Sequence, residues 1–264
     1  FFAAAPFLAI PLYVFLGKSR YPQKITRRRE LRGVARALWE ERRTSLPAST
    51  RDETIDQMRM RAFERLADVP LLAGNRCDLL IDGEAAFDAI FAAIDAAERY
   101  VLFSSYTIRD DTLGHAFGER LIAARRRGVS VRILYDGVGS NRLSRSWVNR
   151  MRAAGVEVVE FNANRRLGSW FQFNFRNHRK IAVVDGDIGF LGGMNVGDEY
   201  MSRDPRFVPW RDTQLKVQGP VVAEIQLSFA EDWLWASDQN LELNWDPAPC
   251  GGETDAVIVA PGPA

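Results

Sequence analysis

The strongest fold signal of this chain is the stretch NHRKIAVVDGDIGFLGGMN, residues 177–195. Its apolar runs at 181–184 and 188–191 favour β-strands, because branched aliphatic and aromatic side chains suit a pleated sheet. Between them stands Asp185-Gly186, a dipeptide strongly preferred in the tight turns of β-hairpins. The stretch therefore predicts a β-hairpin.

The side chains that carry chemistry lie at the open end of this hairpin. With a two-residue loop, His178 lies opposite Gly193, whose missing side chain lets backbone or a ligand approach closely. Side chains alternate along a strand, so the His178 imidazole and the Lys180 ammonium point the same way. Asn195 projects an amide donor towards the same end. Asp185 has the opposite strand parity and begins the turn, so we expect it to hold structure through hydrogen bonds.

This combination of side chains suits phosphoryl chemistry. Lys180 supplies a fixed positive charge and Asn195 a neutral donor, and both stabilise oxyanions as negative charge redistributes. His178 can attack phosphorus as a nucleophile and split one hard substitution into two easier ones. The competing interpretation is a surface hairpin with an incidental His and Lys. A lone histidine would favour that interpretation, whereas this spacing with two glycines and an amide argues against it.

The spacing of these residues also carries a family resemblance. The pattern His178-x-Lys180-x(4)-Asp185-x(6)-Gly192-Gly193-x-Asn195 resembles the HKD motif of the phospholipase D superfamily at every position. Other stretches resemble bacterial cardiolipin synthases in order and spacing: Gly74-Asn75, Asp82-Gly83, Tyr106 with Asp110-Asp111, Gly128-Val129, and the ranges 136–140, 192–200 and 210–213. The resemblance covers nearly the whole chain.

The resemblance implies phosphatidyl transfer through a phosphohistidine intermediate, without a metal or other cofactor. By position, His178 is then the nucleophile, Lys180 and Asn195 bind the phosphate, and Asp212 orients an active-site imidazole, as carboxylates do in other histidine enzymes. The plainer alternative for Asp212 is a structural salt bridge. The catalytic residues that the resemblance implies are His178, Lys180, Asp185, Asn195 and Asp212, and the substrate-binding residues are His178, Lys180, Gly193 and Asn195.

The chain departs from the family in one respect. Family members carry two HKD motifs, whose histidines act as nucleophile and general acid, and this chain has one. The second histidine, His115, sits in a helical pattern with no lysine two residues on, which favours a surface or packing role. We therefore expect 73–264 to be the first of two phospholipase D-like domains, with the second half missing. The alternative is a single-motif enzyme that completes its site with a second subunit.

The body of the chain alternates between strand-like and helical patterns. Such alternation predicts an α/β domain with a mixed, mainly parallel sheet flanked by helices. Expected strands are 77–81, 100–107, 129–135, 156–161, 181–184 and 188–191, and expected helices are 84–98, 113–127, 146–154 and 217–236.

The N-terminus indicates a membrane. Residues 1–16 carry no charge, and basic residues follow at once, which predicts the end of a transmembrane segment over 1–17 with the rest of the chain in the cytoplasm. The range 18–72 is expected to be a basic, helical juxtamembrane linker. Residues 1–46 have a net charge of +7, which leaves −6 for the rest of a chain whose net charge is +1. An acidic body argues against a nucleic-acid partner, and a basic arm fits anionic lipid.

The leading functional hypothesis is cardiolipin synthesis from two phosphatidylglycerol molecules at the bacterial inner membrane, on its cytoplasmic side. Hydrolytic phospholipase D, a dimeric HKD endonuclease and a non-catalytic membrane protein are the alternatives. The alternating aromatics of 170–175 predict a half-buried strand or, alternatively, a lipid-facing lip beside the site.

Overall fold

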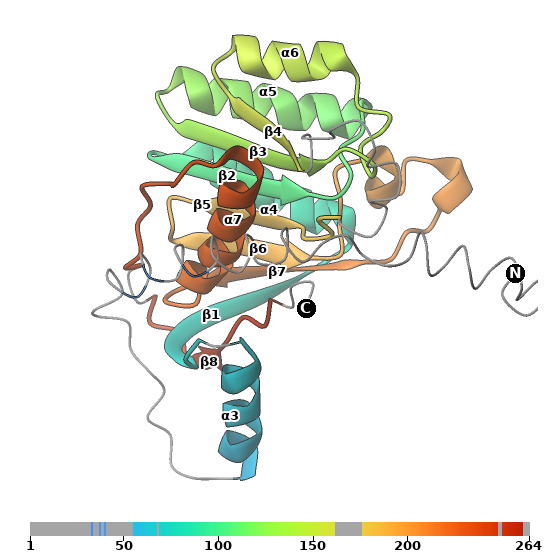
Figure 1. The fold of residues 1–264 in the computed structure, drawn as a ribbon. Helices are drawn as coiled ribbons and strands as arrows, with labels where there is room; N and C mark the ends of the chain where they lie inside the picture. The colour runs from blue at the N-terminus through green and yellow to red at the C-terminus, as the bar shows by residue number, and fades with distance from the viewer. Residues whose placement is uncertain are drawn as a thin grey trace, which may run out of the picture.

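The computed structural model describes residues 55–67, 69–161, 176–247 and 250–260, together with the single positions 33, 37 and 40. These residues form one eight-stranded sheet with helices on both faces (Figure 1). The strands are β1 (Leu72–Ile81), β2 (Tyr100–Ser105), β3 (Ser130–Asp136), β4 (Glu157–Phe161), β5 (Ile181–Val184), β6 (Ile188–Gly192), β7 (Thr213–Gln218) and β8 (Thr254–Ala256). The helices are α3 (Ile55–Ala67), α4 (Asp82–Ala96), α5 (Thr112–Arg126), α6 (Arg145–Ala153) and α7 (Val222–Ser237), with short 3-10 turns η1 (Asp198–Met201) and η2 (Pro205–Phe207).

The strand order is β4-β3-β2-β5-β6-β7-β1-β8. Only β2 with β3 and β3 with β4 pair in parallel among the described strands, and the other neighbours are antiparallel. The expectation of a mixed sheet is confirmed, but the expectation of a mainly parallel one is wrong. Helices α5 and α6 provide the long crossovers that parallel neighbours need, whereas β5 and β6 are joined by a tight turn and must run antiparallel.

The sheet separates two hydrophobic cores. Along β2, Val101 and Phe103 pack with α4 and α5, while Leu102 packs with α7 on the other face. Along β5, Ala182 belongs to the first core and Val183 to the second. This alternation is what a strand buried on both faces requires. In Figure 1, helix α7 crosses one face of the central strands and α4 lies behind them.

Glycines with positive φ lie at the end of α5 and shortly before the start of α7. Gly128 follows α5 with a φ of +95°, a left-handed position after the helix end that favours glycine. The expected helix over 217–236 begins too early, because Val217 belongs to β7. The chain turns at Gly219, where φ is +102°, and the helix starts at Val222.

No helix among the described residues is long and apolar enough to cross a membrane. The expected membrane segment 1–17 lies outside the described residues, as do most of the expected linker 18–72 and the aromatic stretch 170–175. Within the linker, α3 is helical as expected.

Candidate active site

The hairpin that carries the motif has a register one residue different from the expected one. Val184 pairs with Ile188, which leaves three residues in the loop instead of two. Asp185 and Gly186 take φ values of 55° and 75°, as a tight turn with two left-handed positions requires. Asp187 is the additional loop residue. The expected pairing of His178 with Gly193 is therefore wrong.

Asp185 anchors this loop to the rest of the sheet. Its carboxylate accepts hydrogen bonds from the backbone N–H groups of Glu98, Arg99 and Tyr100, at 2.9, 2.7 and 2.8 Å. Its own N–H donates to the Tyr100 carbonyl at 2.9 Å. The structural role expected from its turn position is confirmed, and these bonds lie at the opposite end of the hairpin from His178.

His178 is exposed and stacks on an aromatic ring. The ring centroids of His178 and Tyr106 lie 4.0 Å apart with an angle of 20° between the planes. The Tyr106 hydroxyl accepts a hydrogen bond from Arg176 at 3.0 Å. Desolvation and the charges of Lys180 and Arg176 lower the pKa of His178, and the Asp136 carboxylate opposes them. A lowered pKa favours the neutral imidazole, which is the form that can attack phosphorus.

Lys180 lies on the same side of the chain as His178. Its Nζ is 5.4 Å from the centroid of the Tyr106 ring and donates to the His178 carbonyl at 2.7 Å. The expectation that the ammonium and the imidazole share one face agrees with this common contact to Tyr106. Desolvation lowers the pKa of Lys180, and the nearby Asp212 carboxylate opposes the shift.

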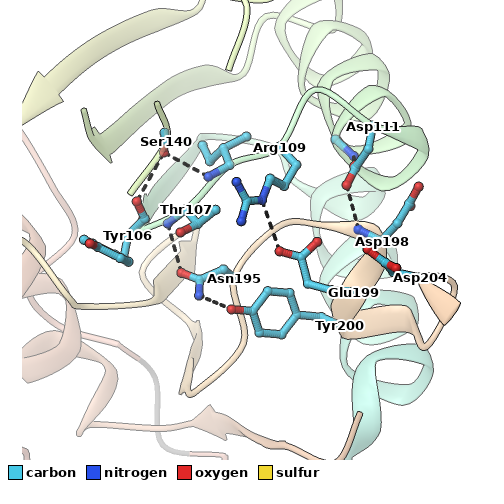
Figure 2. Close-up of polar contacts among 12 residues, drawn as sticks. Tyr106, Thr107, Arg109, Asp111, Ser140, Asn195, Asp198, Glu199, Tyr200 and Asp204 are labelled. Atoms are coloured by element: carbon cyan, nitrogen blue, oxygen red, sulfur yellow. Dashed lines mark hydrogen bonds and ion pairs between the residues drawn. The ribbon is translucent and has the colours of Figure 1, made fainter. Parts of the chain in front are cut away.

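Asn195 is buried, with 5% of its surface exposed, and its side chain is already engaged (Figure 2). Its Oδ1 accepts from the Thr107 N–H at 3.0 Å and from the Ser105 hydroxyl at 3.2 Å. Its Nδ2 donates to the Tyr200 hydroxyl. The amide is thus held rigidly at the end of β6, with one of its two N–H hydrogens committed to Tyr200.

Gly193 lies against Asp212. A Cβ built on this glycine would lie 2.3 Å from Asp212 Oδ1, so no other residue fits without displacing the carboxylate. Asp212 Oδ1 accepts a hydrogen bond from the backbone N–H of its neighbour Thr213 at 2.7 Å. Among the described residues, Asp212 contacts no imidazole and acts electrostatically on Lys180. Its role in orienting an imidazole stays a prediction.

A network of polar contacts fixes the loops around Asn195 (Figure 2). Arg109 Nε lies 3.1 Å from Glu199 Oε1, and the Asp198 N–H donates to Asp111 at 2.7 Å. The Ser140 hydroxyl accepts from the Ile108 N–H at 2.9 Å. These contacts tie the loops after β2, β3 and β6 together behind the site.

Two residues of the site were missed by reasoning from the motif alone. Tyr106 stood only within the family resemblance and Tyr200 within the range 192–200, and neither was assigned a role. The signal for both is their position: Tyr106 directly follows the buried strand β2, and Tyr200 lies in the 3-10 turn η1 after β6. His115, by contrast, is exposed on α5 and lies 3.1 Å from Asp110. It takes no part in the site, as its sequence context predicted.

The described residues contain no group of three or more His, Cys, Asp or Glu side chains arranged to hold a metal ion. What the site offers is an exposed imidazole, a lysine beside it and a rigid amide, at the open end of a hairpin in a mixed sheet. That fold and that arrangement define a phospholipase D-like domain.

Comparison with known proteins gives the family. Residues 90–233 match the family described as "Cardiolipin synthase, PLD-like domain", so the chain belongs to this family. It is 44% identical over 237 residues to cardiolipin synthase A of Pseudomonas putida strain GB-1, covering 89% of this chain and 50% of that protein. It is 39% identical over 262 residues to cardiolipin synthase A of Pseudomonas aeruginosa strain LESB58, covering 98% of this chain and 54% of that protein. The chain thus spans about half the length of the curated relatives it matches.

Among solved structures, the phosphatidylserine synthase of Haemophilus influenzae matches with a TM-score of 0.51 and 16% identity. The match covers 66% of this chain and 40% of that one. At this identity the likeness concerns the fold alone.

Proposed function

We propose that this chain forms one half of a phosphatidyltransferase site that makes cardiolipin from two phosphatidylglycerol molecules and releases glycerol. The observation that carries the proposal is the grouping of the exposed His178 imidazole with Lys180 at the end of the hairpin, both against the ring of Tyr106. The name shared by the relatives, cardiolipin synthase A, supports the same substrate class.

The chemistry proceeds in two displacements. In the first, the neutral imidazole of His178 forms a bond to phosphorus, and the bond from phosphorus to the glycerol headgroup oxygen breaks. Lys180 stabilises the negative charge on the phosphoryl oxygens. In the second, a hydroxyl of another phosphatidylglycerol attacks the phosphohistidine, the bond to nitrogen breaks, and the imidazole is regenerated. In the first displacement the departing glycerol takes a proton from a general acid, and in the second the conjugate base of that acid accepts the proton of the attacking hydroxyl.

The general acid requires a second histidine, which we place in a second HKD domain of the same protein or of another subunit. His115 is on the surface of α5 and is not available for this role. An exposed apolar face of β1 is an argument for such a second domain. Leu79 on β1, opposite Leu215 in the β1–β7 ladder, is 62% exposed, and Ile81 on the same face is 44% exposed. A second domain that packs on this strand face would bury them.

The same proposal places the protein at the inner membrane, with this domain on the cytoplasmic side. Its support is the uncharged range 1–16, followed by a basic arm that suits anionic lipid. The substrate is then delivered in the plane of the bilayer, and no nucleic acid is involved.

The test uses the full-length protein with vesicles that contain radiolabelled phosphatidylglycerol, followed by separation of the lipids. Cardiolipin with free glycerol supports the proposal. Phosphatidic acid instead means that water resolves the intermediate and the protein is a hydrolase. If no lipid product forms, both the transferase and the hydrolase proposals are refuted.

Replacement of His178 by alanine should abolish product, because the nucleophile is lost. As a matched control, His115→Ala removes the other histidine of this chain and should leave the rate unchanged. Retained turnover in His178→Ala would refute its role as nucleophile.

A further inference from the structure

The chain around His178 is not held by the sheet. The β2–β5 ladder ends at the pair of Ser104 and Ile181, and residues 176–180 precede that pair outside any strand. We call residues 176–180 the nucleophile segment. Because no ladder bonds fix this segment, its position depends on side-chain contacts.

Asn177 holds the segment on the N-terminal side of His178. Its backbone N–H donates to Asp136 Oδ2 at 3.0 Å, and its Nδ2 donates to Asp232 Oδ2 at 3.0 Å. A longer contact of 3.4 Å joins Nδ2 to the Ser104 hydroxyl. Asp136 ends β3 and Asp232 lies on α7, and their exposed fractions are 2% and 1%.

Arg179 holds the segment on the other side. Its guanidinium Nη1 lies 2.5 Å from Asp232 Oδ2 and 3.4 Å from the Ser228 carbonyl. Its backbone N–H donates to Asn177 Oδ1 at 3.0 Å. The same Asp232 oxygen therefore binds the neighbours of His178 on both sides.

We propose that the buried carboxylates of Asp232 and Asp136 are positioning residues that fix the backbone on both sides of the His178 nucleophile. The proposal rests on the phosphatidyl transfer proposed above. Positions 177 and 179 point towards α7, and positions 178 and 180 point towards Tyr106, so the contacts restrain the segment without blocking the imidazole. Charge-assisted bonds to buried carboxylates are the strong kind of hydrogen bond.

The two acids differ in what else they do. Asp136 Oδ1 also accepts from the N–H groups of Val138 and Gly139, at 2.9 and 3.1 Å, so Asp136 orders the loop after β3 as well. Asp232 compensates the charge of Arg179, whose side chain is 17% exposed. Asp232 is therefore the cleaner position at which to test the proposal.

The experiment compares two variants of helix α7 in the full-length protein. Asp232→Asn weakens the bonds to Asn177 and Arg179. Glu224→Gln is the matched control, because Glu224 is a similarly buried acid on α7. Its carboxylate accepts a hydrogen bond from the Ile258 N–H, and Ile258 is far in the sequence from the nucleophile segment. Three quantities are measured: Tm, the kcat and KM for phosphatidylglycerol, and amide hydrogen exchange across the nucleophile segment.

Asp232→Asn should lower kcat by about 10- to 100-fold with KM changed less than about twofold, because a displacement near 1 Å at a reacting group costs rate on that scale. Amide exchange in the nucleophile segment should become faster. Glu224→Gln should change neither kcat nor the amide exchange rate of the nucleophile segment, even if it lowers Tm as much as Asp232→Asn does.

Three results would overturn the proposal: an unchanged kcat in Asp232→Asn, an equal loss of kcat in both variants, or an unchanged exchange rate in the nucleophile segment. A wild-type protein without lipid activity would refute the proposed function, and the exchange comparison would then decide on the positioning role alone.

Discussion

Replacement of Asp185 by asparagine separates a structural role from a catalytic role for the acidic member of the motif. The Asp185 carboxylate binds three consecutive backbone N–H groups, from Glu98 to Tyr100, at 2.7 to 2.9 Å. Asparagine retains one acceptor oxygen and tolerates the φ of 55° at this position. Its amide nitrogen, however, faces backbone N–H groups and cannot accept from them.

The magnitude follows from the number of bonds. With about 1 kcal/mol for each bond lost, Asp185→Asn should lower the free energy of unfolding by about 1–2 kcal/mol. Asp185→Ala loses all three bonds and adds about 1 kcal/mol for positive φ, for a total of about 4 kcal/mol. For domains of roughly this size, 1 kcal/mol corresponds to about 2–4 °C in Tm. The expected decreases are therefore about 2–8 °C for asparagine and about 8–16 °C for alanine.

The assay is thermal unfolding of the full-length protein, followed by kcat/KM measured well below the lowest Tm. We expect Asp185→Asn to lower Tm while kcat/KM stays within a few-fold of the wild type. Asp187→Asn is the control, because its pair with Arg99 is about half exposed and contributes little. The structural role of Asp185 is refuted if Asp185→Asn keeps its Tm and loses activity as completely as His178→Ala.

Three further outcomes are expected. Tyr200→Phe removes the hydroxyl that holds the buried site amide and should lower kcat by roughly tenfold, measured as initial rates of transfer; an unchanged kcat would contradict this. Asp136→Asn removes the charge that raises the pKa of His178, so the acid limb of the pH profile of kcat/KM should move to lower pH, whereas an upward shift would contradict the assignment. Leu79→Asp should lower the Tm of the full-length protein through lost domain packing, whereas Leu66→Asp on exposed α3 should not; equal shifts would argue against a packed second domain.

The kinds of element could be predicted from the sequence more completely than their pairing. Apolar runs that alternate with helical patterns correctly predicted α5, α6 and the strand β3 between them. The strand β7 was not predicted from the sequence. Its alternating segment TQLKVQ contains only two apolar residues and is followed closely by a strongly helical sequence. Strand directions beyond β4 depend on which strands meet across the sheet, and such long-range pairing has no local pattern.

The register of the hairpin shows the same limit at the scale of one residue. An Asp-Gly pair alone predicts a two-residue loop. In the structure the Asp185 carboxylate accepts a hydrogen bond from the Arg99 N–H just before β2, and the loop includes Asp187. That contact joins residues separated by 86 positions, so no local reading of the sequence contains it.

The motif correctly predicted that His178 and Lys180 point the same way, although residues 176–180 lie outside any strand and ladder pairing does not fix them. Their surroundings are not local. The ring of Tyr106 comes from the loop after β2, and the acids that hold the nucleophile segment come from β3 and α7. A motif of this kind therefore predicts which side chains react, whereas the fold determines how they are held.

The arrangement also gives two neighbouring cations different electrostatic surroundings. Arg179 and Lys180 are neighbours, yet the guanidinium is paired with the buried Asp232, which stabilises its charged form and raises its pKa. Lys180 is paired with no carboxylate at hydrogen-bonding distance among the described residues, and Asp212 acts on it only as a nearby charge. The charge of Arg179 is thus neutralised within the fold, while that of Lys180 stays available to a phosphoryl oxygen. Exchanging the two side chains would keep the net charge of the segment and should still abolish transfer, because the cation would be retained and its position lost.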